Sequence, residues 1–470
     1  MNRRRLHLSL STAAALALGL ALRLWFIVHA ARIAGDTLVY GDIAKNWLQH
    51  GIYGFTQTAS LPHPTLIRLP GYPLFLVLCF TLFGVEHYTA VMLLQSLIDL
   101  ATCLILSRLA LHLFGPRTAR ITLWIAALCP FTASYVAAPL TETLSLTCIA
   151  LAFFAIQRWQ ACGLGFNRWL AVLAAALAYA ILLRPEQGLL SAAIFPAMFW
   201  IVWSTQPTLS QPQAKSLRPF APLLVAAFAT LLPLVPWTAR NWSTFHVLQP
   251  LAPRYATDPG EFVPLGFQHW FRTWGIDFAS TDDVYWNYDG APIDIADIPS
   301  RAFDSQAQYA RTAELFDEYN LTDNATPAFD ARFQALARQR IRANPIRYYL
   351  ALPVARLLNM AFRPRTEMLP VALDWWNWRD HPSQSAFSLA FALLNLAYFV
   401  FAALGFHRWR RQRPAGLPPL AWAMIASIAL RAALLLTLDN SEPRYTLEFF
   451  PILILAAALA LSRQPLPTID

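Results

Sequence analysis

The chain has 470 residues, of which 57% are hydrophobic and only 13% are charged. With a mean hydropathy of +0.41, it has too few polar side chains to cover the surface of a soluble globular protein of this length. The net charge of +9 does not indicate a nucleic-acid partner, because the arginines cluster beside apolar segments and no basic helix or stacking module is present. We therefore expect an α-helical polytopic membrane protein.

Apolar segments long enough to cross a hydrocarbon core of about 30 Å recur along the chain. We predict about ten spans, with eleven or twelve as alternatives: 8–31, 88–114, a third that ends near 138, 144–157, 168–183, a sixth that ends near 203, 220–237, 386–406, 419–438 and 447–461. The arginines before the first span also resemble a signal peptide, but the apolar run continues past Arg23 and favours a retained span. Residues 72–83 are too few to cross and should form a half-buried helix at the membrane boundary. Arg-rich turns alternate with acid-rich turns, so the positive-inside trend places both termini in the cytoplasm.

The chain divides into three predicted parts. Residues 1–243 form an N-terminal transmembrane module that includes a long extracytoplasmic first loop at 32–73. Residues 244–384 are polar, rich in Asp and Trp, and lack a continuous span, so they should form an extracytoplasmic mixed domain. Within it, 328–360 should be one helix that lies in the membrane interface. Residues 385–470 form the C-terminal transmembrane helices.

The first loop combines acids, aromatic residues and a proline-flanked arginine between two apolar segments. A short helix is predicted there because four residues recur at helical spacing and would share one side: Asp36, Tyr40, Ile43 and Trp47. Asp42 falls on a different face of this helix. The later run of prolines cannot continue a helix, so it should be extended or turning, and it delivers Arg68.

Two ordered patterns stand in this loop: Asp36-x3-Tyr40-x3-Ala44-x-Asn46-x-Leu48-x2-Gly51-x-Tyr53, and Arg68-Leu-Pro-Gly-Tyr-Pro73. Together they resemble the first extracytoplasmic loop of the GT-C glycosyltransferases. Within that superfamily they resemble family 39, which includes the protein mannosyltransferases and the lipid A aminoarabinose transferase. In this chain an arginine replaces the lysine of some members, and the second acid directly after Asp36 is missing.

The resemblance implies a GT-C-type transmembrane bundle in which the loop aspartate, Asp36, is catalytic. It also implies that Arg68 contacts the phosphate of a lipid-linked donor. Tyr40 and Tyr72 belong to the same two patterns and are candidate substrate-binding residues. Without the resemblance, Asp36 would be interpreted as a solvated loop acid or a helix N-cap.

Glu142 is the second candidate catalytic residue. It stands where the chain turns back from the predicted outer face, at the expected start of a span. Free backbone amides and the helix dipole favour a carboxylate at such a position, so helix capping is one interpretation. The stretch from Tyr135 to Leu144 also resembles the second acidic motif of the family, which implies that Glu142 orients the acceptor or shares its proton.

Three arginines lie at predicted outer membrane boundaries, against the positive-inside trend: Arg184, Arg240 and Arg444. They are either snorkelling anchors or phosphate ligands, because an arginine fork offers parallel donors to phosphate. Glu442-Pro-Arg-Tyr445 resembles the final motif of the family, so we place Glu442, Arg444 and Tyr445 among the substrate-binding residues, with Arg184 and Arg240. Pro236-Trp237-x2-Arg240 also resembles a family signature, which we assign to structure.

These observations predict a glycosyltransferase that uses a polyprenyl-phosphate sugar as donor and a lipid, glycan or protein as acceptor, at the extracytoplasmic face of a bacterial inner membrane. The phosphate leaves as a stable anion, so one carboxylate base for the acceptor is sufficient, and an inverting single displacement follows. No cofactor is expected, because the sequence has no HxxxH or CxxC metal motif. Asp282-Asp283 could bind a divalent cation, although a solvated loop is the simpler interpretation.

Two other classes of function stay open. A lipid or polysaccharide transporter, or a flippase, would place polar residues at mid-bilayer depth, which Arg23, Asp99 and Arg431 approach. A non-catalytic assembly subunit would not need Asp36 and Glu142 together.

Overall fold

The computed structural model describes residues 10–56, 61–205, 218–413 and 416–462. The chain folds into two compact units, which we treat separately. Unit 1 comprises Met1–Asp258, Ala397–Leu430 and Leu447–Asp470, and unit 2 comprises Pro259–Leu396 and Arg431–Thr446. The three-part division expected from the sequence stays a prediction.

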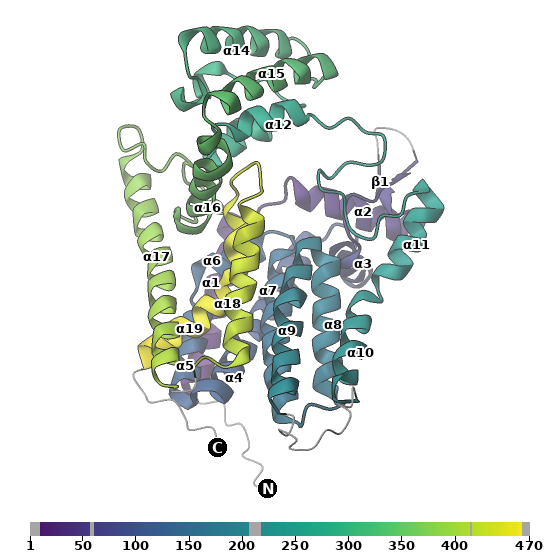
Figure 1. The fold of residues 1–470 in the computed structure, drawn as a ribbon, viewed down its shortest axis with the longest axis vertical. Coiled ribbons are helices and arrows are strands. Elements are labelled where there is room, and N and C mark those ends of the chain that lie inside the picture. The colour runs from purple at the N-terminus through teal and green to yellow at the C-terminus, as the bar shows by residue number, and fades with distance from the viewer. Residues whose placement is uncertain (1–9, 57–60, 206–217, 414–415, 463–470) are drawn as a thin grey trace, which may run out of the picture. The chain divides into compact units, whose positions relative to one another are not determined.

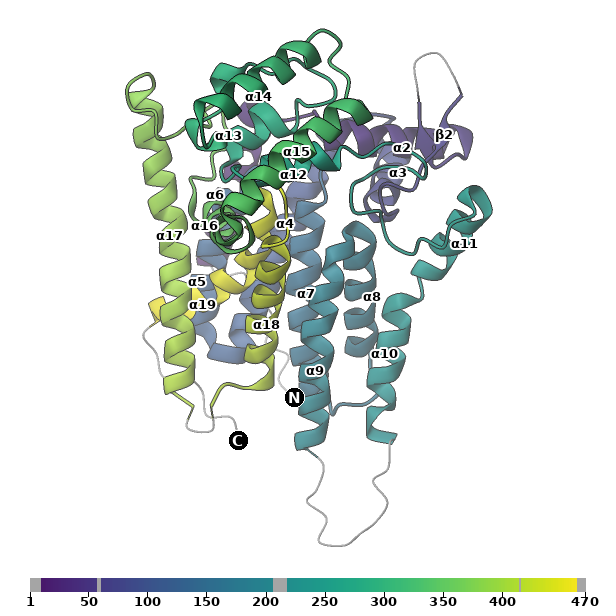
Figure 2. The ribbon, with the colours of Figure 1, turned by 45° about the horizontal axis from the view of Figure 1, so that its top comes forward.

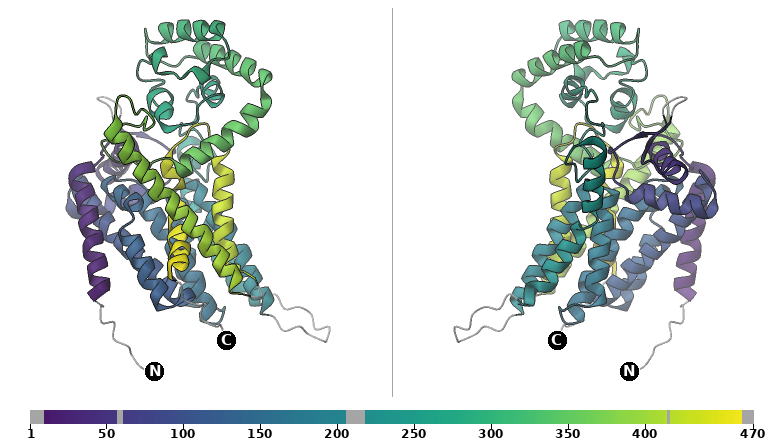
Figure 3. Two further views of the ribbon diagram at one scale, coloured as in Figure 1. Left: turned by 90° about the vertical axis from the view of Figure 1, so that its left-hand side faces the viewer. Right: turned by 90° about the vertical axis from the view of Figure 1, so that its right-hand side faces the viewer.

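Unit 1 consists of helices and a short pair of strands. Its helices are α1 (Leu10–Ala30), α2 (Asp36–His50), α3 (Gly71–Phe83), α4 (Tyr88–Phe114), α5 (Pro116–Ala127), α6 (Pro130–Ala133), α7 (Glu142–Ala161), α8 (Arg168–Leu183), α9 (Gly188–Ser204), α10 (Ala221–Leu231), α11 (Leu234–Phe245) and α19 (Phe450–Ser462), with parts of α17 (Pro382–Arg411) and α18 (Pro419–Leu435). Strands β1 (Gly54–Phe55) and β2 (His63–Pro64) pair antiparallel. Helices α7, α8, α9 and α10 run side by side (Figures 1 and 2). Figure 3 shows α1, in purple, along one flank of the helices of this unit.

Seven helical segments among the described residues are long and apolar enough to cross a membrane. The pair Pro116–Ala127 and Pro130–Ala137 passes the same test together but is bent by 47°. Two further predicted spans, α8 and α18, are apolar helices of 16 and 17 residues. The prediction of an α-helical polytopic membrane protein is therefore confirmed. The count of ten spans stays a prediction.

The bend between α5 and α6 has a local cause. Pro130 has no backbone N–H, so it cannot continue the hydrogen-bond ladder of α5, and a new helix begins there. The 3-10 turn η1 (Ser134–Ala137) then carries the chain toward the start of α7. Residues 131–139 are all buried. An irregular, buried segment therefore precedes Glu142.

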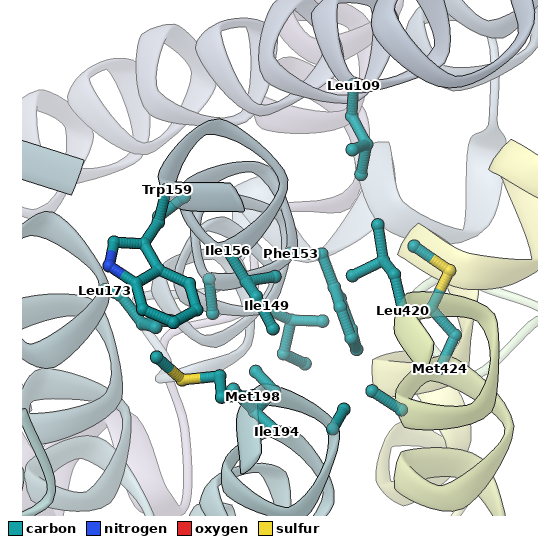
Figure 4. Close-up of a cluster of buried hydrophobic side chains, with 14 of the residues drawn as sticks. Leu109, Ile149, Phe153, Ile156, Trp159, Leu173, Ile194, Met198, Leu420 and Met424 are labelled. Atoms are coloured by element: carbon teal, nitrogen blue, oxygen red, sulfur yellow. The ribbon is translucent and has the colours of Figure 1, made fainter. Parts of the chain in front are cut away.

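The main core of unit 1 lies between α7 and the helices around it. Figure 4 shows side chains from α4, α7, α8, α9 and α18 packed together: Leu109, Ile149, Phe153, Ile156, Trp159, Leu173, Ile194, Met198, Leu420 and Met424. Within a bilayer, close packing of this kind holds helices together, because lipid tails are as apolar as the side chains. The ends of α7 and α8 next to two predicted site residues pack in a second cluster, where Leu144 and Leu183 lie with Tyr40 and Tyr72.

Helix α2 lies across the end of the unit 1 helices, transverse to α7 and α8 (Figures 1 and 2). It begins at Asp36, directly after Gly35, and ends at His50. Gly51 follows with a φ of 69°, the left-handed conformation that suits glycine after a helix. The short helix predicted from Asp36 is confirmed. The predicted boundary helix at 72–83 is also present, as α3.

Unit 2 contains a helical subdomain with an aromatic core. Its helices are α12 (Leu265–Arg272), α13 (Phe278–Ser280), α14 (Gln306–Tyr319), α15 (Pro327–Ala343) and α16 (Leu352–Phe362), the last preceded by the π-helical turn η7 (Arg347–Ala351). Figure 1 shows α15 between α14 and α12. Phe267, Trp270 and Phe333 are completely or almost completely buried in its core.

The single helix predicted over 328–360 is wrong, because the chain breaks after α15. Asn344 leaves the helical region with φ −149° and ψ 82°, and Pro345 follows it. A residue before proline is driven out of the helical conformation by the proline ring, which accounts for the break. The chain then continues as η7 and α16.

Candidate active site

Helix α2 carries Asp36 and Asp42 on different faces. Asp36 lies in its first turn and Tyr40 one turn later, so both project from the same side. The Asp42 carboxylate is engaged elsewhere, where it accepts a 2.7 Å hydrogen bond from the backbone N–H of Thr56 and lies 3.6 Å from Nζ of Lys45. The placement of Asp36 and Asp42 on different faces therefore follows the predicted spacing.

Arg68 lies in the turn after strand β2. Its Nη2 donates to Oδ1 of Asp36 at 2.8 Å, and its guanidinium carbon lies 5.7 Å from the centre of the Tyr40 ring. The side chains of Arg68 and Asp36 are 22% and 26% exposed, so both can be reached from solvent. An arginine fork binds carboxylate and phosphate with the same parallel geometry, so phosphate can compete for this position.

Tyr72 lies in the first turn of α3 and is completely buried. Its hydroxyl donates to Oε1 of Gln95 at 2.7 Å, and its ring packs edge-on against Tyr40 with the ring centres 5.1 Å apart. Gly71 allows α3 to approach α8 closely, because a Cβ there would lie 2.5 Å from the backbone of Leu182. The structure therefore places Tyr72 against Tyr40, with its hydroxyl bound to α4.

Glu142 is the first residue of α7 and belongs to a buried charge cluster. Its Oε1 accepts from Nη1 of Arg184 at 3.1 Å, and its side chain is only 3% exposed. Nε of Arg184 also donates to Glu186 at 2.8 Å and lies 3.7 Å from Oε1 of Glu448. One arginine thus contacts three carboxylates, which come from three separate turns or helix ends.

Glu186 and Glu448 were not among the residues predicted from the sequence. Glu186 stands two residues after Arg184 in the 3-10 turn η2 (Pro185–Gln187), so its proximity to Arg184 was a usable signal. Glu448 stands at the end of η8 (Pro443–Phe449), directly before an apolar helix. A lone acid beside an apolar run is a signal for a buried partner, and it could have identified this residue.

Tyr40 is influenced by the charges of both ion pairs. Burial raises the pKa of its hydroxyl to about 12, while the charges of Arg68 and Arg184 lower it and those of Asp36 and Glu142 raise it. Both pairs therefore act on the same phenol. At neutral pH Tyr40 keeps its proton and can donate a hydrogen bond.

Arg240 donates hydrogen bonds to two separate segments of the first loop. Its Nη1 donates to the carbonyl of Thr65 at 2.7 Å, and its Nη2 donates to the carbonyl of Tyr53 at 2.8 Å. The guanidinium also lies 5.3 Å from the Trp237 ring and 5.4 Å from the Tyr53 ring. These contacts support a structural role for the motif Pro236-Trp237-x2-Arg240.

Glu442, Arg444 and Tyr445 lie in unit 2 and form a cluster of their own. Arg444 pairs with Glu442, and its guanidinium carbon lies 5.8 Å from the centre of the Tyr445 ring. Nε of Arg431 donates to the carbonyl of Tyr445 at 3.2 Å. The motif is therefore organised by its own charges and by α18.

Within the described ranges, no group of three or more His, Cys, Asp or Glu side chains is arranged to hold a metal ion. Asp282 and Asp283 lie in the π-helical turn η4 (Thr281–Tyr285) of unit 2. Partial burial, followed by the neighbouring charge of Asp282, raises the pKa of Asp283 to about 6.

Residues 62–237 match the family model described as dolichyl-phosphate-mannose-protein mannosyltransferase. The matched part contains Arg68, Tyr72, Glu142 and Arg184, and it begins after Asp36 and Tyr40. The resemblance to protein mannosyltransferases is therefore confirmed for this part of the chain. No curated protein matches the chain in sequence at a significant level.

Several solved structures align with this chain. The archaeal oligosaccharyltransferase AglB from Archaeoglobus fulgidus, in complex with an inhibitory peptide and a dolichol-phosphate, is 11% identical, with a TM-score of 0.46, over 96% of this chain and 50% of its own. The oligosaccharyltransferase of the same organism in complex with Zn and sulfate is 13% identical, with a TM-score of 0.46, over 96% and 48%. ArnT from Cupriavidus metallidurans bound to undecaprenyl phosphate is 15% identical, with a TM-score of 0.40, over 96% and 77%. The chain spans about half the length of the archaeal chains.

Proposed function

We propose that this chain, whose residues 62–237 form a mannosyltransferase-type segment, transfers a sugar from a polyprenyl-phosphate donor to an acceptor at the membrane surface. The observation that carries this proposal is the ion pair between Asp36 and Arg68, beside the phenol of Tyr40. It joins a carboxylate that can act as a base with a guanidinium that can bind phosphate. The family description, which names a dolichyl-phosphate sugar, supports a lipid-phosphate donor.

In this mechanism Asp36 takes the proton of the acceptor nucleophile while the acceptor attacks the sugar carbon. The bond between that carbon and the phosphate oxygen breaks, and the phosphate leaves as an anion that Arg68 stabilises. A single displacement of this kind inverts the configuration of the sugar. The exposure of Asp36 supports the assignment, since a base must be reached by the incoming acceptor, whereas Glu142 is almost completely buried.

Glu142 then has a supporting role. Its carboxylate is held by Arg184 at 3.1 Å, and its charge acts on Tyr40 together with that of Asp36. We assign it the orientation of the acceptor through this phenol and its neighbours. Glu442, Arg444 and Tyr445 remain proposed substrate-binding residues.

The protein is a multi-pass membrane protein, and we propose a bacterial inner membrane with the site at the extracytoplasmic face. Lipid, glycan and protein acceptors are all compatible with a carboxylate that is 26% exposed to solvent. The transporter alternative is not favoured, because Arg23 and Asp99, which lie at mid-span in unit 1, bind each other. Nε of Arg23 donates to Asp99 at 2.9 Å, and its Nη1 donates to the carbonyl of Ala127 at 2.8 Å.

The test is a transfer assay with the purified full-length chain in lipid nanodiscs. Radiolabelled polyprenyl-phosphate sugars are supplied singly, each with membrane lipid, glycan or peptide acceptors, and the labelled product is identified. We expect one donor to give label on one acceptor class, with loss of label transfer in the Asp36→Asn variant. Failure of every polyprenyl-phosphate sugar, with folded protein, would overturn the proposed donor class.

A further inference from the structure

Gln95 lies in the first third of α4 and is completely buried. Its side chain makes three hydrogen bonds to other segments. Its Oε1 accepts from the hydroxyl of Tyr72 at 2.7 Å. Its Nε2 donates to the carbonyl of Ala138 at 2.9 Å and to that of Val136 at 3.3 Å. One side chain in a membrane span thus joins α3 to the irregular segment before α7.

The first of these bonds leads to Asp36. Tyr72 packs edge-on against Tyr40. The guanidinium of Arg68 lies over the Tyr40 ring, 5.7 Å from its centre. Arg68 in turn donates to Asp36. The orientation of Tyr72 therefore limits where Tyr40 and the ion pair above it can lie.

The other two bonds lead to Glu142. Val136 and Ala138 lie in the buried stretch where η1 ends, and the carbonyl of Ala138 also accepts from the N–H of Leu140 at 2.8 Å. Glu142 begins α7 two residues later. Ala137 lies between Val136 and Ala138, and its carbonyl accepts from the N–H of Arg32 at 2.9 Å. Arg32 stands shortly before the start of α2. The same short stretch is therefore anchored to both acid-bearing segments.

We propose that Gln95 is a positioning residue that fixes the two acidic segments of the site relative to each other, and that Tyr72 acts with it rather than by binding substrate. This inference rests on the proposed function and deepens it. A glutamine suits the task because its amide presents an acceptor and two donors at once. An apolar side chain at this position would leave the Tyr72 hydroxyl and two carbonyls without these bonds in a buried setting, which is unfavourable.

Three variants test the inference: Gln95→Met, which keeps the volume and removes all three bonds; Tyr72→Phe, which removes one bond and keeps the ring; and the double variant. The matched control is Ser96→Ala, because Ser96 is the next residue, is equally buried and, among the residues that the structure describes, its hydroxyl bonds only the carbonyl of Met92 in its own helix. Turnover is measured per folded protein, with donor KM and thermal stability in parallel.

We expect turnover to fall about fivefold in Tyr72→Phe and about twentyfold in Gln95→Met, with donor KM changed by less than about threefold, since one net hydrogen bond is equivalent to roughly a 2- to 12-fold effect. The double variant should lose no more than Gln95→Met alone, because the two residues act through one bond. Ser96→Ala should stay within about twofold of the wild type. Losses that multiply in the double variant, or a fall in stability with unchanged turnover per folded protein, would overturn the proposal.

A readout that does not depend on transfer separates this inference from the proposed function. Hydrogen–deuterium exchange should increase in Gln95→Met at residues 32–42 and 138–145, and it should not increase in Ser96→Ala. If the wild type transfers no sugar, the proposed function fails while this exchange pattern still decides the positioning role. Unchanged exchange at both segments would reject the positioning role whatever the activity.

Discussion

Nη2 of Arg68 donates to Oδ1 of Asp36 at 2.8 Å, so the predicted phosphate ligand and the predicted base are bound to each other. Both side chains are about one-quarter exposed. The guanidinium therefore holds the carboxylate in place. Under the proposed mechanism we expect an incoming phosphate to compete for the same donors and to release the carboxylate oxygens for the acceptor proton.

The Arg68→Ala variant should mainly raise the donor KM. A charge-assisted hydrogen bond is worth about 1.5–3 kcal/mol, which corresponds to a roughly 10- to 100-fold change in KM. Initial rates measured over a range of donor concentrations test this. Arg68→Lys is the control, and it should give an intermediate KM because it keeps the charge and loses the parallel donors. An unchanged KM with reduced kcat in Arg68→Ala would place the phosphate elsewhere.

The Arg184→Met variant should destabilise unit 1 strongly, because three carboxylates lose the guanidinium they share. Removing one partner of a buried ion pair costs about 3–5 kcal/mol. Thermal unfolding of the purified variants in detergent measures this effect, together with the yield of monodisperse protein.

Glu142→Gln is the matched comparison for that experiment. It keeps an oxygen for Arg184 and removes the charge, so we expect a smaller loss of stability and a turnover reduced about tenfold. Full turnover in Glu142→Gln would exclude Glu142 from the site and leave it as a structural partner of Arg184.

The stability of unit 2 should decrease as the pH rises from about 4 to about 6. Asp283 has a folded-state pKa of about 6, above the value of 3.8 for a free carboxyl, because of partial burial and the nearby charges of Asp282, Asp297, Asp277 and Asp374. A carboxyl with a raised pKa binds its proton more tightly in the folded state, so folding is favoured below this window and less so above it. Solvent screening limits the effect to about 1 kcal/mol or less.

Asp283→Asn tests this expectation. It should raise the unfolding temperature at pH 7.5 and flatten the dependence on pH between about 4 and 7. Asp317→Asn, on the exposed side of α14, should leave the dependence unchanged. If Asp283→Asn retains the full pH dependence of the unfolding temperature, other groups cause that dependence.

Local patterns allowed part of the site to be predicted from the sequence. The spacing of Asp36 and Tyr40 specifies a common helix face, because helical periodicity depends only on neighbouring residues. The contacts of Arg184 with Glu448 and of Arg240 with Thr65 could not be predicted in this way, since they depend on how distant segments approach in the folded chain. A single glutamine in an apolar span, as at Gln95, indicates a buried polar partner, but the sequence does not indicate which distant segments supply it.

The fold was also predictable where local sequence patterns determine it. The apolar runs predicted where long apolar helices form, because length and hydropathy act locally. The break after α15 was also encoded locally, in Asn344-Pro345, but the strong helical pattern on both sides obscured it. The bend at Pro130 has the same origin.

The predicted topology is tested by alkaline phosphatase fusions, which are active only when exported. A fusion after Tyr255 should be active, and a fusion after Arg413 should be inactive. The reason is the basic end of α17, where Arg408, Arg410 and Arg411 favour the cytoplasmic side. An active fusion after Arg413 would contradict ten spans with both termini inside.

Asp36→Asn is the variant on which the proposed mechanism depends most. The amide keeps the shape of the side chain and an oxygen that can accept from Arg68, while it removes the basicity. A positioned base contributes typically 100- to 10,000-fold, or about 3–5 kcal/mol of barrier. We therefore expect the variant to fold and bind donor normally and to lose at least a hundredfold in turnover, measured in single-turnover reactions with labelled donor. Asp42→Asn is the control, because Asp42 bonds Thr56 on another face of the same helix, and it should retain most of its activity. Near-normal turnover in Asp36→Asn would remove the base from this position, and equal losses in both variants would mean that α2 contributes through its fold rather than through one carboxylate.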